Sequence, residues 1–121
     1  MAGMTSKNFD SPDETRTPDK TKVDVLDLGG AKVARMNLQP GWKWSECIKP
    51  VVGGDSCQVL HVGMVESGTI HIVHNDGDEA DVGPGNAYRI APGHDAWVVG
   101  NEPFVAYEFE TTAAETYAKG S

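Results

Sequence analysis

Short apolar stretches, rich in valine, isoleucine and aromatic residues, alternate along this chain with clusters of glycine, proline, asparagine and aspartate. Many of these stretches show the two-residue alternation that turns one face of a strand toward a core. We predict strands at residues 23–28, 31–38, 42–48, 57–65, 69–74, 79–82, 87–90, 96–99 and 104–109. Regularly spaced short strands without a long amphipathic helix are typical of an antiparallel barrel or jelly-roll sandwich.

One stretch, residues 83–95, marks the fold most clearly, because it reads as a turn, a strand and a second turn. Gly-Pro-Gly at 83–85 can reverse the chain sharply, since glycine tolerates positive φ and proline fixes φ. A strand at 87–90 follows, and Pro-Gly at 92–93 ends it immediately before His94. This stretch therefore predicts a tightly turned β-structure that holds His94 in place.

The chain divides into a polar arm at residues 1–21, an all-β domain at 22–111 and a tail at 112–121. The arm contains too little apolar surface to fold alone, so we expect it to be disordered or extended. Within the tail, residues 112–119 can form one turn of helix. With 121 residues, the chain is long enough for one domain with a substantial core.

The formal net charge of −8 argues against a nucleic-acid partner, which needs a clustered basic surface. No window approaches the roughly 18 apolar residues of a transmembrane helix, and the polar start lacks a signal region. We therefore expect a cytoplasmic protein with no membrane partner. Its two cysteines, Cys47 and Cys57, are then expected to be thiols.

Two motifs resemble those of a known family. In the first, Gly41 is followed after five residues by Cys47 and then Lys49, and six residues separate His61 from Gly68. In the second, Gly85 precedes Ala91-Pro92-Gly93 and His94. These spacings resemble the two motifs of the cupin superfamily, a jelly-roll β-barrel with antiparallel strands, minimal helix and a metal site between the motifs.

The resemblance is strongest in the glycines and turns, and weaker at the metal ligands. Cys47 and Lys49 stand where the family has two histidines, and His61 stands where it has a glutamate. His94 lies two positions before the family's second-motif histidine, which falls on Ala96. The chain is also similar to small stand-alone bacterial cupins that carry Trp-x-Trp-Ser-Glu-His, Asp-Ser-Cys-Gln and Pro-Gly-His-Asp-Ala-Trp. Against that pattern Cys47 of this chain replaces a histidine, whereas His61 and His94 match.

The resemblance implies a metal site, for which the candidate ligands are Cys47, His61 and His94. One thiolate and two imidazoles suit a divalent metal, Zn²⁺ above all, with water or substrate in a fourth position. Asp95 is a candidate to orient His94, and Glu46 is an alternate ligand if its strand is bulged. In the alternative interpretation, His61 is a buried histidine bonded to backbone and His94 faces water.

Aromatic residues are concentrated in the predicted barrel, where they either form the core or line a ligand pocket at its mouth. The candidate pocket residues are Trp44, Tyr88, Trp97 and Tyr107. Lys49 either acts as a base of lowered pKa or points its ammonium group into water.

We expect a metal-dependent enzyme that acts on a small organic molecule in the barrel mouth. The alternative is a non-catalytic small-ligand or metal-binding cupin, such as a sensor, that has lost the standard site. A purely structural role is a third possibility, because this fold hosts many activities. We expect a homodimer formed through edge strands.

Overall fold

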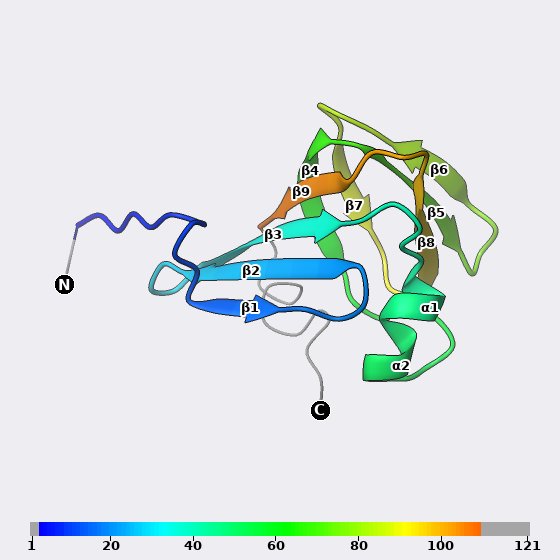
Figure 1. Ribbon diagram of the computed structural model, residues 1–121, viewed down its shortest axis with the longest axis horizontal. Helices are drawn as coiled ribbons and strands as arrows, with labels where there is room; N and C mark the ends of the chain where they lie inside the picture. Colours follow the sequence, from blue (N-terminus) through cyan, green and yellow to red (C-terminus); the bar gives the residue numbers. More distant parts are fainter. Residues whose placement is uncertain (1–2, 110–121) are drawn as a thin grey trace.

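Two antiparallel β-sheets make up most of the molecule (Figure 1). The computed structural model describes residues 3–109. Its strands are β1 (Glu14–Arg16), β2 (Thr21–Asp27), β3 (Lys32–Leu38), β4 (His61–Ser67), β5 (Thr69–His74), β6 (Glu79–Val82), β7 (Ala87–Ile90), β8 (His94–Val99) and β9 (Phe104–Glu108). One sheet has the order β1-β2-β3-β9-β4-β7, and the other has the order β6-β5-β8. Within residues 3–109 these strands form two separate sheets rather than one closed barrel.

The core lies between the two sheets, and strands such as β8 and β9 direct every second side chain into it, whereas β2 has four consecutive buried residues, 23–26. In β8 the residues facing the core are His94, Ala96 and Val98, whereas in β9 they are Phe104, Ala106 and Glu108. Their neighbours in sequence are more exposed, as the two-residue period requires. Each of these strands therefore carries one polar side chain into an otherwise apolar interior.

The turns around β7 follow the prediction from the sequence. Asn86 donates its backbone N–H to Gly83 O at 3.0 Å, and Gly85 has a φ of 84°, which a residue with a Cβ rarely adopts. The predicted strands at 69–74, 79–82 and 87–90 have the observed bounds of β5, β6 and β7. Local turn chemistry was therefore sufficient to place this part of the chain.

The predicted strand at 42–48 is wrong, because the chain there forms two short helices, α1 (Trp44–Cys47) and α2 (Lys49–Val52). Trp44, Cys47 and Ile48 are buried, and their spacing of three and four residues is that of one helix face. The alternation of Trp42 and Trp44 suggested a strand, but these two side chains are buried from a turn and a helix. Figure 1 shows α1 beside the end of β8.

Two other boundaries differ from the prediction. The strand predicted at 57–65 begins only at His61, and Cys57 contributes an isolated bridge to His94. The arm predicted at 1–21 includes β1, which pairs with β2 in the register Thr15↔Asp24. The tail at 112–121 and its predicted helical turn lie outside the described residues. In residues 3–109, no helix is long and apolar enough to cross a membrane.

Two glycines with similar backbone angles provide a test of the packing between β4, β5 and β9. Gly68 (φ 77°) and Gly29 (φ 80°) both adopt left-handed angles. A Cβ on Gly68 would lie 2.3 Å from Pro103 O and 2.7 Å from Phe104 Cα, whereas a Cβ on Gly29 would meet no atom within 4 Å. We expect Gly29→Ala to lower the free energy of unfolding by about 1–2 kcal/mol through backbone strain alone. Gly68→Ala should lower it by more than about 3 kcal/mol, because the clash adds to that strain.

Urea unfolding of both variants measures the difference. Equal losses in the two variants would contradict the close approach of Gly68 to the start of β9.

Candidate metal centre

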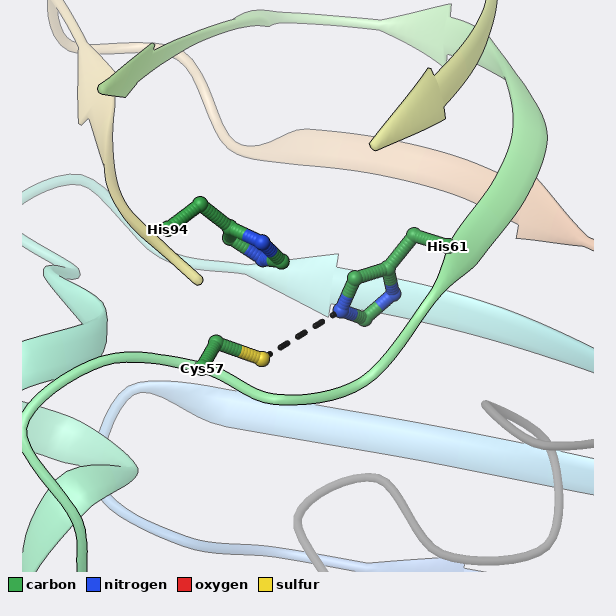
Figure 2. Close-up of side chains that lie close together, drawn as sticks. All are labelled: Cys57, His61 and His94. Carbon is green, nitrogen blue, oxygen red and sulfur yellow. Dashed lines mark hydrogen bonds between the residues drawn. The ribbon is translucent and has the colours of Figure 1, made fainter. Parts of the chain in front are cut away.

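Three buried side chains, Cys57, His61 and His94, meet in the interior, as Figure 2 shows. Each offers one ligand atom, and these atoms all lie within 4.8 Å of one another. The three residues are at most 4% exposed. Groups of this kind inside a protein need partners or a bound ion, because an unpaired buried polar group is costly.

The strands place these side chains through their alternation and one local bridge. His61 begins β4 and His94 begins β8, both at positions that face the core. Cys57 lies before β4 and is held against β8, because its N–H donates to His94 O at 2.7 Å and Gly93 N–H donates to Cys57 O at 2.6 Å. The turn at Gly93 (φ 98°) brings these backbone groups together.

Both histidines are oriented through Nδ1. His61 Nδ1 donates to the carboxylate Oε1 of Glu108 at 2.7 Å, and His94 Nδ1 donates to Ala91 O at 2.8 Å. With Nδ1 donating to an acceptor, Nε2 is the ring nitrogen that can bind a metal, and carboxylates and carbonyls commonly accept from Nδ1 at metal sites. His61 Nε2 lies 3.6 Å from Cys57 Sγ.

Glu108 is itself held by a second donor, since the Tyr88 hydroxyl donates to Glu108 Oε2 at 2.6 Å. Gly63 pairs with Tyr88 on one side and with Glu108 on the other. A Cβ on Gly63 would lie 3.0 Å from the Tyr88 hydroxyl and 2.2 Å from Tyr107 O. The absence of a side chain at Gly63 thus lets the Tyr88 ring reach across β4 to Glu108.

Without a metal, the electrostatics favour a thiolate next to a protonated imidazole. Burial alone would raise the pKa of the Cys57 thiol, but hydrogen bonds and positive charge from His61 and His94 outweigh it and lower that pKa to about 6. Burial alone would lower the pKa of His61, but the Glu108 carboxylate and the Cys57 thiolate raise it. A thiolate is the form of cysteine that binds metals.

The ligand set fits a tetrahedral divalent ion. With Zn–S near roughly 2.3 Å and Zn–N near roughly 2.0–2.1 Å, tetrahedral angles separate sulfur and nitrogen by about 3.6 Å. The distance between Cys57 Sγ and His61 Nε2 has this value, which also suits a sulfur–nitrogen hydrogen bond in the metal-free site. This pair therefore already has the separation that such an ion requires, and the third ligand atom lies within 4.8 Å of both.

The structure brings together two of the three predicted ligands, His61 and His94, but the thiol beside them is that of Cys57 and not that of Cys47. Cys47 lies in α1, where its Sγ contacts Asp19 Oδ2 at 3.9 Å. Its placement follows from the helix that replaces the predicted strand. Glu108 was also missed, although its alternation with Phe104 and Ala106 already placed it on the inward face of β9.

Of the other predicted site residues, Trp44 and Tyr88 line the interior cavity next to the cluster, and the rest lie elsewhere. Asp95 Oδ1 accepts the N–H groups of Ser45 and Ala96, so it holds the first turn of α1 and makes no recorded bond to His94.

The remaining four predicted residues lie outside the cavity. Glu46 and Trp97 border a separate surface pocket beside Lys43. Tyr107 donates to Glu66 Oε1 at 3.2 Å, and Lys49 begins α2.

The interior cavity adjoins the cluster and has a volume of about 30 Å³, enough for one or two water molecules. Its lining is mostly apolar: Met36, Leu38, Trp42, Trp44, His61, Ile70, Tyr88, Ile90, His94, Ala96, Phe104 and Glu108. A wider groove of about 530 Å³ lies between β7 and the hairpin formed by β5 and β6. Tyr88 and Ile90 border both spaces, so β7 forms the wall between them.

No family model matches this chain, and no curated protein matches it in sequence. Solved structures of similar fold do exist. A protein of unknown function from Rhizobium leguminosarum bv. viciae 3841 has a TM-score of 0.62 at 18% identity, over 89% of this chain and 97% of that one. A DUF1255 protein of unknown function from Acidithiobacillus ferrooxidans has a TM-score of 0.58 at 16% identity, over 91% and 98%.

The plu4264 protein from Photorhabdus luminescens has a TM-score of 0.54 at 17% identity, over 94% of this chain and 92% of that one. Identities this low show a shared fold and no more. The small all-β architecture is therefore one that several bacterial proteins adopt, two of these three being described as of unknown function.

The Glu108 network yields a testable prediction. In Glu108→Gln the side chain keeps its shape, but the amide has one acceptor oxygen for two buried donors, His61 Nδ1 and the Tyr88 hydroxyl. We expect the free energy of unfolding to fall by about 2–3 kcal/mol, because one donor loses its partner. Glu66→Gln, which alters an exposed acceptor of the Tyr107 hydroxyl, should change it by less than about 0.5 kcal/mol.

Chemical denaturation of both variants in the presence of a chelator isolates this effect from metal binding. Similar stabilities for the two variants would show that Glu108 is not the buried acceptor described here.

Proposed function

We propose that this chain is a cupin-type protein that binds one divalent metal ion through Cys57, His61 and His94 and acts as a metal-dependent enzyme on a small molecule. The observation that carries the proposal is the convergence of three buried ligand atoms within 4.8 Å. The antiparallel sheets around an apolar core, together with the cupin-like turns at residues 83–85 and 91–93, support the cupin assignment.

Zinc is the metal that this ligand set favours. A thiolate with two neutral imidazoles is a borderline-soft donor set, and it matches the Cys/His sites at which Zn²⁺ is commonly bound. Structural zinc sites have four protein ligands, whereas catalytic sites have three and keep one position open. Among residues 3–109, the cluster supplies three ligands, so the site resembles the catalytic kind.

Such an ion supplies Lewis-acid polarisation or an activated water when it is bound. The protein's own groups hold the ligands in place. Glu108 fixes the ring of His61, Tyr88 fixes Glu108, and Ala91 O fixes the ring of His94. The apolar walls of the cavity keep the dielectric constant low, which strengthens every electrostatic interaction at the centre.

The volumes of the inner cavity and of the outer groove limit where a substrate can bind. The inner cavity admits only a few heavy atoms, whereas the outer groove can hold a small organic molecule. We infer that a substrate lies in the groove and that only its reactive end passes Tyr88 and Ile90. The small inner volume also favours the second candidate function, a non-catalytic metal centre that senses a small ligand.

Elemental analysis of the purified protein tests the metal centre. We expect about one zinc or similar ion per chain, lost in His61→Ala and strongly reduced in Cys57→Ser, because each change removes a ligand. Cys47→Ser is the matched control, since Cys47 is also a buried free thiol but lies outside the cluster. It should retain the metal.

Stability provides a second measurement of the same binding. A metal held only by the folded state raises the free energy of unfolding by about 2.7 kcal/mol at one hundred times its Kd. A chelator should therefore lower the unfolding midpoint of the native protein and of Cys47→Ser, but not that of Cys57→Ser. The proposal would be excluded if the native protein is purified without metal and added Zn²⁺ does not change its unfolding midpoint.

Cytoplasmic localisation and a homodimer through edge strands stay predictions. The outer edge of β8 is bridged at His94 by Cys57 and at Trp97 by Lys43, whereas the edge strands β1, β6 and β7 have no second β-partner among the described residues. These are the surfaces at which such a dimer would form.

A further inference from the structure

Two tryptophans line the same inner cavity but differ in their hydrogen bonding. The Trp42 indole N–H donates to Thr21 Oγ1 at 2.9 Å. The Trp44 indole N–H is buried and has no hydrogen-bond partner within the part of the chain that the structure describes. Both side chains are only 2% exposed. Trp44, whose side chain lines the cavity, thus retains one unused donor among the described residues.

An unpartnered N–H in a protein interior is unusual, because the group loses its bond to water without gaining another. Tryptophan offers a donor and no acceptor, so only an electron-pair donor can satisfy it. Apart from Trp44, the cavity's polar groups are His61, His94, Glu108 and Tyr88, and the other lining side chains are apolar apart from the satisfied Trp42 indole. Since no described residue accepts this N–H, a molecule that enters the cavity is the candidate acceptor.

The volume, and not the charge, defines that molecule further. A divalent ion with one thiolate and two neutral imidazoles carries a net charge of +1, and the Glu108 carboxylate, which lines the same cavity, brings the sum to zero, so charge does not select an anion over a neutral ligand. The volume of about 30 Å³ limits the ligand to roughly two or three heavy atoms. The volume and the two binding groups therefore favour a small ligand with lone pairs at both ends, one for the metal and one for the Trp44 N–H.

We propose that the cavity binds a small ligand of about two or three heavy atoms, whose first end binds the open position of the metal and whose second end accepts a hydrogen bond from Trp44 Nε1. This inference rests on the proposed metal centre, and it makes Trp44 a ligand-binding residue. Trp42, in contrast, is a wall residue whose N–H is already used by Thr21.

Azide is a suitable probe, because it has three heavy atoms and lone pairs at both ends. The protein is loaded with Co²⁺, whose absorption reports both the thiolate ligand and the coordination number, and is then titrated with azide. We expect Trp44→Phe to weaken azide binding about tenfold, the effect of one lost hydrogen bond. Trp42→Phe should bind azide within about twofold of the native protein. Imidazole, a five-membered ring, should leave the spectrum unchanged at concentrations at which azide saturates it.

The outcomes separate the two proposals. If Co²⁺ gives no thiolate absorption band, the metal centre itself is absent. If the band forms but Trp44→Phe binds azide as tightly as the native protein, or imidazole binds as tightly as azide, the inference about the cavity is wrong.

A second measurement covers the case in which Trp44→Phe does not fold. In the Zn²⁺-loaded native protein, azide should shift the NMR signal of the Trp44 indole N–H and leave that of Trp42 in place. An unchanged Trp44 signal at saturating azide would overturn the inference.

Discussion

A carboxylate in an apolar core is stable only if donors satisfy it, and Glu108 has two, the His61 ring at 2.7 Å and the Tyr88 hydroxyl at 2.6 Å. The three residues belong to neighbouring strands β9, β4 and β7, so one buried group joins three strands. Gly63 makes this possible, because it leaves space between Tyr88 and Glu108. The same contact fixes the ring of His61, and the metal centre depends on that orientation.

Much of the fold follows from local chemistry. The glycine and proline turns around β7 and the alternation in β5 and β9 predicted those strands well, since both signals act over a few residues. The secondary structure of residues 42–48 could not be predicted from local signals, because the apolar positions there fit a strand and a helix equally. What decides between them is contact with a distant strand, in which Asp95 of β8 accepts the N–H of Ser45 in α1.

In the candidate site, too, the residues with a local sequence signal were predicted and those that depend on long-range contacts were not. His61 and His94 were predicted because an isolated histidine among valines and a histidine after a tight turn are visible in the sequence. Cys57 was not identified as a ligand, because its place beside His94 depends on a backbone bridge between two positions that are 37 residues apart in the sequence. Long-range pairing of this kind leaves no local pattern. The small cavity and the unpartnered Trp44 N–H likewise result from packing between sheets.

The central claim is that Cys57, His61 and His94 bind one metal ion. X-ray absorption spectroscopy of the zinc-loaded protein tests it most directly, because the spectrum distinguishes sulfur from nitrogen ligands. We predict one sulfur at about 2.3 Å and two imidazole nitrogens at about 2.0–2.1 Å, with the sulfur signal lost in Cys57→Ser and kept in Cys47→Ser. A first shell without sulfur, or one whose sulfur persists in Cys57→Ser, would contradict this account.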